Sequence, residues 1–418
     1  KDGIQLVNEI LKTDIPDDWS VITLGNYAQI FRGGSPRPIQ AFLTTSDKGV
    51  NWIKIGDVGE EDKFIKSTEE KIVPEGVSRS RMVFRGDLIL SNSMSYGRPY
   101  IMNIEGCIHD GWLVIQKYDR VFDRDYLYYA LSSGLTMKQY VAMAAGSSVQ
   151  NLNKEKVSKI VLPCPRISEQ KSIAEVLSDI DTLIIDLKKL IRKKKDIRQG
   201  TMQMLVTGKK RLDGFSGDWV KINLAKNSRL KARIGWQGLT TAEYLDEGYS
   251  YLITGTDFKD GRINWNGCHY VNYDRYVQDP NIQVSNGDLL LTKDGTIGKV
   301  AYISDLNRPA TLNSGVFVVK PITDAYTAHF MFYVLESSVF KEFLQQLSAG
   351  STINHLYQKD LVKFDLYVPP TTEEQEAIIG ILCDMDLDIY KLEEKLSKYQ
   401  KIKQGMMDEL LTGKVRLV

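Results

Sequence analysis

Cysteine and uninterrupted apolar sequence are both scarce in this chain. No run approaches the roughly 18 to 20 apolar residues that span a bilayer, and residues 1–15 lack the apolar core of a signal peptide. The cysteines lie far apart, in neither a disulfide framework nor a zinc-ligand spacing: Cys107, Cys164, Cys268 and Cys383. We therefore expect a soluble, cytoplasmic protein whose cysteines are core or incidental thiols.

An excess of charge of one sign is also missing. The 418 residues include 54 Lys and Arg against 53 Asp and Glu, which gives a formal net charge of +1. A uniformly cationic coat for nucleic acid is therefore excluded. The length allows two or three domains, and the ordinary apolar content of 43% argues against wholesale disorder.

Motifs of the common catalytic classes are missing as well. The only Pro-Pro pair follows a valine, so the Asn/Asp-Pro-Pro-Tyr/Phe motif of adenine methyltransferases is absent. The Gly-Lys pairs within 207–209 and 412–414 close helices instead of opening them, so neither is a phosphate-binding loop of the Walker A type. Acid-lysine runs at 69–71 and 186–188 lack a partner acid in a supporting context. We expect no catalytic residue and no metal site.

What the chain does contain is an internal duplication. Residues 170–212 align with residues 375–417 without a gap and are identical at 18 of 43 positions. Upstream, GDLIL at 86–90 matches GDLLL at 287–291, whereas the loops that follow differ almost completely. The sequence therefore predicts two copies of one scaffold that carry different loops.

Each copy ends in a long stretch with apolar residues at heptad spacing, which is typical of a coiled coil. The expected coiled-coil and partner-binding positions are Ile173, Leu177, Ile180, Ile184, Leu187 and Ile191, and Ile378, Leu382, Met385, Ile389, Leu392 and Leu396. The first helix is predicted over about 170 to 206, and the helices end at Gly208 and Gly413. The alternative is an ordinary long core helix of a larger α domain. Basic residues between Lys188 and Arg211 either contact DNA phosphates or form a solvated face.

Two globular segments precede these helices. Residues 19–165 and 219–369 hold short runs rich in Val, Ile, Tyr and Leu between Gly, Asn, Asp and Ser, which is typical of half-buried strands joined by exposed loops. One helix is expected in each, near 124–131 and 325–335. The predicted fold class is α+β, with mixed α/β globular domains at 1–167 and 213–371 and long helices at 168–212 and 372–418.

The loops of the globular segments carry residue types that read base edges, since arginine or lysine pairs with guanine and asparagine or glutamine with adenine. The candidates are Arg32, Ser35, Arg37, Lys54, Asn92, Ser93, Tyr96 and Arg98 in the first segment, and Arg233, Trp236, Gln237, Lys293, Asp294, Thr296 and Lys299 in the second. Arg98 and Lys299 each follow a glycine, which offers flexible backbone amides and a cation to a phosphate. Each residue by itself is more typical of a turn former, a cap or a solvated side chain, and only the clustering of these residues on loops favours DNA recognition.

Taken in order, these features resemble a known family. The motifs are WSVITLG at 19–25, GDLLL at 287–291, DGTIGK at 294–299, AGSTI at 349–353, EEQEAI at 373–378 and LTGK at 411–414, within a duplicated arrangement of globular segment and helix. Over nearly its whole length the chain resembles the DNA specificity subunit of type I restriction-modification systems. The order and duplication of the motifs carry this resemblance more than any single motif.

The resemblance implies that 1–167 and 213–371 are target-recognition domains, each reading half of a bipartite site in double-stranded DNA. The two helices would pair antiparallel as a spacer. Two methyltransferase subunits would dock and methylate adenine N6 with S-adenosylmethionine, and restriction subunits would bring a motor and nuclease that use ATP and Mg²⁺. The chain itself would bind no cofactor and no membrane.

Three rival hypotheses stay open at the level of sequence. One is an unrecognised active site in one globular segment. Another is an architectural coiled-coil adaptor whose globular heads bind proteins. The third is the recognition module of a different restriction class.

Overall fold

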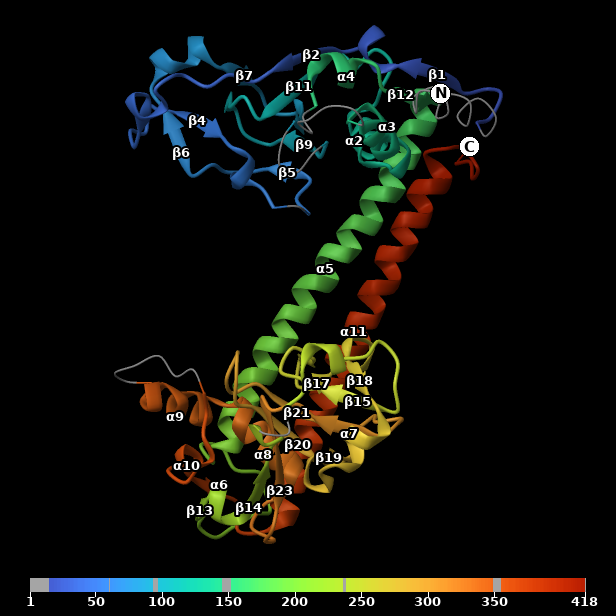
Figure 1. Cartoon of the computed structure of the whole chain (residues 1–418). Coiled ribbons are helices and arrows are strands. Elements are labelled where there is room, and N and C mark those ends of the chain that lie inside the picture. Colours follow the sequence, from blue (N-terminus) through green and yellow to red (C-terminus); the bar gives the residue numbers. More distant parts are fainter. Residues whose placement is uncertain are drawn as a thin grey trace. The chain divides into compact units, whose positions relative to one another are not determined.

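A computed structural model describes residues 15–59, 61–92, 97–144, 152–235, 238–348 and 355–417. The chain divides into two compact units: unit 1 comprises Lys1–Lys188 with Glu394–Val418, and unit 2 is Lys189–Glu393. Each unit therefore combines one globular segment with part of each long helix (Figure 1).

The strands of unit 1 form two mixed five-stranded sheets and one antiparallel pair. The first sheet has the order β3 (Leu43–Thr44), β6 (Glu70–Ile72), β4 (Val50–Ile53), β10 (Gly106–Ile108), β7 (Arg81–Val83). The second has the order β2 (Gln29–Arg32), β11 (Trp112–Gln116), β8 (Leu88–Ser91), β9 (Pro99–Met102), β5 (Phe64–Ile65). The pair is β1 (Ser20–Thr23) with β12 (Val161–Cys164), which brings the two ends of the globular segment together.

Unit 2 repeats this plan, with its described strands grouped into two four-stranded sheets and two antiparallel pairs. One sheet has the order β14 (Ser228–Lys231), β23 (Val316–Pro321), β20 (Leu289–Thr292), β21 (Val300–Tyr302). The other has the order β18 (His269–Val271), β15 (Ser250–Ile253), β22 (Ala310–Leu312), β19 (Gln283–Val284). Separate pairs join β13 (Val220–Asn223) to β24 (Asp365–Val368) and β16 (Phe258–Lys259) to β17 (Arg262–Ile263). In both units one parallel pairing, β4 with β10 or β15 with β22, sits at the same place in the order, so the duplication is structural.

The helices of the two units also correspond. Unit 1 contains α2 (Arg124–Ser132), α3 (Gly134–Ala144) and α4 (Lys154–Ser158), and unit 2 contains α6 (Leu224–Asn227), α7 (Tyr273–Val277), α8 (Ala328–Glu336), α9 (Ser338–Ser348) and α10 (Gln358–Leu361). The long helices are α5 (Ile167–Val206) and α11 (Thr372–Leu410). The helices predicted near 124–131 and 325–335 are confirmed as α2 and α8, and the mixed helix and strand content agrees with the predicted fold class.

The long helices contribute to the core of each unit. In unit 1, Ile173 and Leu177 of α5 share one hydrophobic cluster with Met407 and Leu410 of α11, beside α2 (Figure 1). In unit 2 the corresponding cluster contains Met202 and Leu205 of α5 with Ile378 and Leu382 of α11. Full burial of each such side chain stabilises the fold by about 1.5–3 kcal/mol. The heptad positions that are buried are Ile173, Leu177, Ile180, Ile184, Leu187, Ile191, Ile378, Leu382 and Ile389, whereas Met385, Leu392 and Leu396 are half-buried.

None of the helices in the described part of the chain is long and apolar enough to cross a membrane.

A charged network joins the helices of unit 2 to its globular part. The guanidinium of Arg198 donates to Asp386 Oδ1 and to Glu336 Oε2, each at 2.8 Å, and Tyr333 donates to Asp386 Oδ2 at 2.9 Å. In unit 1, Lys403 Nζ lies 2.5 Å from Asp181 Oδ1 and Tyr129 donates to Asp181 Oδ2 at 2.8 Å, so a cation and a tyrosine meet the matching aspartate. The Arg198 side chain is only 14% exposed, so the pairs that it makes are weakly screened by water.

We expect Arg198→Met to lower the free energy of unfolding by about 2 kcal/mol, because it leaves two neighbouring carboxylates without their partner in a partly buried site. Urea denaturation measures the change. The matched control is Lys195→Met, which breaks the exposed pair with Glu393 at 2.7 Å and should cost less than about 1 kcal/mol. Equal costs for the two variants would contradict this account.

A histidine lies between aromatic rings in unit 2. His329 of α8 stacks on Tyr302 with ring centroids 4.1 Å apart and on Tyr333 at 5.5 Å, and its Nε2 is 3.6 Å from Cys383 Sγ. Burial lowers the pKa of His329 below its ordinary value of 6.5, although Asp386 opposes part of this effect. The folded protein therefore favours the neutral imidazole.

The stability of unit 2 should fall as the pH drops below about 6.5, because the unfolded chain then takes up a proton that folded His329 resists. The stabilising contribution of neutral His329 is fully present above about pH 6.5. As the pH falls, the free energy of unfolding decreases on this account by at most about 1.4 kcal/mol per pH unit. We expect His329→Phe to flatten the dependence of unfolding free energy on pH, measured by urea titrations across the acidic range. His269→Phe, at an exposed position, should leave the wild-type slope unchanged. A slope that is the same in His329→Phe as in the wild type would refute the assignment.

Candidate functional site

Four of the predicted residues of unit 1 gather around one aspartate that is not among the predicted candidates. Arg32 Nε and Asn92 Nδ2 donate to the backbone carbonyl of Asp110 at 3.0 and 2.8 Å. Ser35 Oγ donates to Asp110 Oδ1 at 2.7 Å. The guanidinium of Arg37 lies 3.9 Å from Asp110 Oδ2. We call Arg32, Ser35, Arg37, Asn92 and Asp110 the Asp110 cluster.

The cluster has a buried base and an exposed charged face. Asn92 is 4% exposed, whereas the side chains of Arg32 and Arg37 are 61% and 84% exposed. The Nη2 atoms of both arginines are 3.8 to 3.9 Å from Asp110 Oδ2, which is beyond hydrogen-bonding distance. The hydrogen bond from Ser35 and the nearby arginine and histidine charges lower the pKa of Asp110, so its carboxyl stays ionised. The Nη2 donors of both arginines thus remain available to a ligand.

Glycine permits the close approach on which the cluster depends. A Cβ at Gly33 would lie 2.1 Å from the carbonyl oxygen of His109, so no larger residue fits without movement of the backbone. Gly33 N donates to Trp112 O at 2.9 Å, and Gly34 N donates to Ile108 O at 3.1 Å. The loop after β2 is therefore fixed to the loop between β10 and β11, which carries Asp110.

The remaining candidates of unit 1 have different surroundings. Lys54 Nζ pairs with Glu70 at 3.1 Å, so its charge is already used within the protein. Arg98 is half-buried, and its backbone N donates to Ser91 Oγ at 3.0 Å. Ser93 and Tyr96 lie outside the described residues.

The equivalent loop of unit 2 is held in the same way. Lys299 N donates to Thr292 Oγ1 at 2.9 Å, and Gly298 N donates to Thr292 O at 3.0 Å, as Arg98 and Gly97 do to Ser91 in unit 1. Gly97 and Gly298 have φ of +78° and +86°, which a side chain would strain. The predicted equivalence of the two Gly-cation loops is thus present in the backbone.

Four of the predicted residues of unit 2 lie on this loop. The Lys293 ammonium lies 5.3 Å from the Phe317 ring centroid, and the carboxylate of Asp294 contacts Nδ1 of His355, a residue not among the predicted candidates. Thr296 and Lys299 are exposed. Trp236 and Gln237 lie outside the described residues.

Arg233 differs from the other candidates because it is buried. It is 2% exposed, and its guanidinium donates to Leu312 O at 3.0 Å and to Thr311 Oγ1 at 3.3 Å. Burial, followed by the charge of Arg275, lowers its pKa from the ordinary value. These contacts hold the end of β22 in place and direct the guanidinium into the protein.

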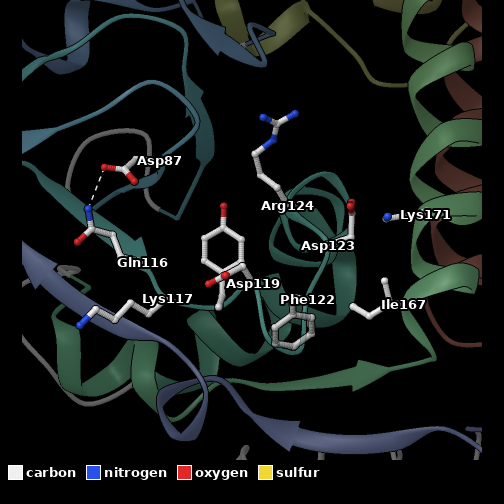
Figure 2. Close-up of a pocket in the computed structure, with 10 residues that line it drawn as sticks. Asp87, Gln116, Lys117, Asp119, Phe122, Asp123, Arg124, Ile167 and Lys171 are labelled. Carbon is white, nitrogen blue, oxygen red and sulfur yellow. Dashed lines mark hydrogen bonds between the residues drawn. The ribbon is translucent and has the colours of Figure 1, made fainter.

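A separate pocket of about 400 Å³ lies in unit 1 at the other end of β11 (Figure 2). Its lining is Asp87, Gln116, Lys117, Tyr118, Asp119, Phe122, Asp123, Arg124, Ile167 and Lys171. Acids and bases occur there in equal number, and Gln116 Nε2 donates to Asp87 Oδ2 at 2.8 Å. The lining offers no cysteine, serine or histidine that could act as a nucleophile or base. Across the described residues, no cluster of three His, Cys, Asp or Glu is placed to hold a metal ion.

Matching hydrogen bonds also lie at the ends of the long helices in the two units. In unit 2, Glu374 of α11 accepts hydrogen bonds from Arg211 at 2.7 and 2.9 Å and from Trp219 at 3.4 Å. In unit 1, Glu169 of α5 accepts them from Arg416 at 2.6 and 2.9 Å and from Trp19 at 3.1 Å. Glu374 and Glu169 are 1% and 5% exposed. These six residues, the helix-end triads, fix where each globular part starts relative to the helices in its own unit.

Of the two missed residues, only Asp110 had a signal in the sequence. Asp110 is followed by Gly111 between two strand-like runs, a pattern that favours a tight turn at a strand end, where recognition loops begin. His355 follows the AGSTI motif and shows no comparable pattern. Its pairing with Asp294 depends on an isolated bridge between distant segments.

Known proteins share the sequence pattern of this chain. Residues 16–199 and 219–404 match the family described as the type I restriction modification DNA specificity domain. The chain is 25% identical over 428 residues to the MjaVIII specificity subunit of Methanocaldococcus jannaschii, covering 96% of this chain and 94% of that protein. It is 24% identical over 399 residues to the EcoBI specificity subunit of Escherichia coli, covering 90% and 80%.

Solved structures share the fold. A chain from a study of complex assembly and conformational transition in a type I R-M system superposes with a TM-score of 0.61 at 16% identity, covering 96% of this chain and 99% of that one. The S subunit of a type I restriction-modification system from M. genitalium gives 0.58 at 15% identity, with coverage of 96% and 97%. With two specificity domains matched along most of its length, the chain belongs to the family of type I restriction-modification DNA specificity subunits.

Proposed function

We propose that each unit reads one half of a bipartite, asymmetric DNA site, and that the long helices set the distance between the halves. One observation carries this proposal: the two units share strand order and loop anchoring, yet the side chains at their loops differ. Strand register and loop hydrogen bonds define equivalent positions in the two units. Unit 1 has Asp110, Asn92 and Arg98 at the positions where unit 2 has Ser314, Lys293 and Lys299. A shared frame with different loop chemistry suits a protein that reads two different sequences.

We further propose that α5 and α11 pair antiparallel along their length. Contacts within unit 1 join Asp181 of α5 to Lys403 of α11 at 2.5 Å. Contacts within unit 2 join Arg198 of α5 to Asp386 of α11 at 2.8 Å. Moving forward along α5 thus corresponds to moving backward along α11, which supports the antiparallel arrangement. Asp181 matches Asp386 and Arg198 matches Lys403 in the repeat, as two-fold symmetry requires.

In this proposal, partner subunits catalyse the reactions. Two methyltransferase subunits would bind the chain and methylate adenine N6 with S-adenosylmethionine, and restriction subunits would supply ATP- and Mg²⁺-dependent translocation and cleavage in the cytoplasm. The chain would bind none of these cofactors. The family match supports DNA recognition over a protein-binding adaptor.

The candidates take different roles according to their exposure. Exposed Arg32, Arg37 and Lys299 are suited to contact DNA, as is Thr296. Since the chain has a net charge of only +1, its phosphate contacts must come from such local cations and from partner subunits. Buried Arg233 supports the strands beneath the loops of unit 2.

Lengthening both long helices should lengthen the unread gap between the half-sites. We expect four residues inserted after Lys194 and four opposite them after Tyr390 to add about 6 Å, or one to two base pairs. Methylation sequencing of DNA from cells that carry the complex measures the gap. The control is the same insertion in α5 alone, which should shift the pairing register and reduce methylation. An unchanged gap after the matched insertion would overturn the spacer role.

Arg233 should matter for stability and not for a particular base. We expect Arg233→Met to lower the free energy of unfolding by about 1–3 kcal/mol, because Leu312 O and Thr311 lose buried hydrogen bonds. Lys299→Met, at an exposed site, should stay within about 0.5 kcal/mol of the wild type in the same urea titration. A stable Arg233→Met variant with an altered DNA sequence preference would show that Arg233 reads a base.

A further inference from the structure

We infer that the Asp110 cluster makes unit 1 specific for a guanine in its half-site, with Arg37 and Arg32 reading the base and Asp110 aiming them. This inference deepens the proposed function and rests on it. It assigns a base to one of the two units and a positioning role to Asp110.

Asp110 is held firmly enough to aim other groups. Its backbone carbonyl accepts from Asn92, which is 4% exposed, at 2.8 Å, and its carboxylate accepts from Ser35 at 2.7 Å. The loop that carries the arginines is tied to the same hairpin through Gly33 and Gly34. Both the aspartate and the arginine loop are therefore set before DNA arrives, which lowers the entropy lost on binding.

The donors of the two arginines suit a base edge. Arg32 donates through its Nε to the Asp110 carbonyl, whereas its Nη2 lies 3.8 Å from Asp110 Oδ2 on a side chain that is exposed. Arg37 is 84% exposed and lies within 3.9 Å of the same oxygen without a hydrogen bond to it. A guanidinium with two free parallel donors matches the O6 and N7 acceptors of guanine in the major groove.

The carboxylate argues against a phosphate as the ligand. Two arginines and one aspartate leave the cluster with one net positive charge, and a phosphate that reached the arginines would also meet Asp110. Guanine O6 and N7 carry no formal charge, so the Asp110 carboxylate does not repel them as it would repel a phosphate. The carboxylate also keeps the two neighbouring guanidinium groups together. The cluster therefore favours the base over the backbone.

The described residues of unit 2 do not form this arrangement. Strand registers place Ala232 where unit 1 has Arg32, and Ser314 where unit 1 has Asp110. A guanine preference set by this cluster should therefore belong to one half-site alone. This difference lets a single experiment separate the two units.

The test uses the whole chain assembled with its methyltransferase subunits in cells, and reads the methylated motif in the host DNA by methylation sequencing. The variants are Arg37→Lys, which keeps the charge but loses the fork of donors, and Asp110→Asn, which keeps the shape but loses the charge. The matched control is Arg85→Ala, an exposed arginine in the turn at the other end of β8. Lys299→Ala marks the half-site read by unit 2.

We expect a guanine in the half-site that responds to unit 1 variants. Arg37→Lys and Asp110→Asn should both relax the preference at that position by roughly 10- to 100-fold, the discrimination of one bidentate pair. The other half-site should stay unchanged, as should both halves in Arg85→Ala. A role for Asp110 in folding alone would lower methylation at every site without changing the motif.

Three results would overturn the inference: a motif without guanine in that half, an unchanged preference in Arg37→Lys, or a loss of methylation in Arg37→Lys that is uniform across sequences, which marks a phosphate contact. If Asp110→Asn does not fold, Arg37→Lys still decides the question, because Arg37 is exposed. Failure of the proposed function looks different, since the wild-type complex would then give no two-part motif.

Discussion

The long helices of this protein carry carboxylates at matching positions, and these join the helices to the globular parts. Glu169 and Glu374 are almost fully excluded from water, and each accepts from one arginine and one tryptophan. Asp181 and Asp386, about three turns further along, each accept from a tyrosine of the globular part. A carboxylate left unpaired in such a place is costly, so each globular part has a strongly preferred position on its own stretch of helix.

This anchoring separates two tasks that would otherwise conflict. Recognition loops need freedom to differ in sequence, whereas a spacer needs fixed geometry. In each unit the strand order and the loop anchors are shared, down to the hydrogen bonds of Gly97 and Gly298. The side chains beyond the anchors are free to change. Duplication of one scaffold thus gives two recognition units. Because the chain has no excess of charge of one sign, selectivity depends on local clusters of side chains.

Much of the fold was predictable, because long-range periodicity and repetition survive in one dimension. The heptad pattern places α5 and α11 to within a few residues, and the repeat predicts two equivalent globular parts. The site was less predictable. Arg32, Ser35, Arg37 and Asn92 were selected for their chemistry, but residue type alone does not separate an exposed arginine from a buried one, as Arg233 demonstrates.

The sequence by itself determined the duplication, the helices, the alternation of domains and helices, and the family resemblance, since each depends on spacing along the chain. Only the tertiary structure decided which loop residues meet. Asp110 reaches Arg32 and Asn92 because β2, β8 and β11 are neighbours in one sheet, with their ends at the same edge. His355 reaches Asp294 through a bridge between distant segments. Contacts of this kind, between residues distant in the sequence, depend on strand order and register, which the local sequence does not encode.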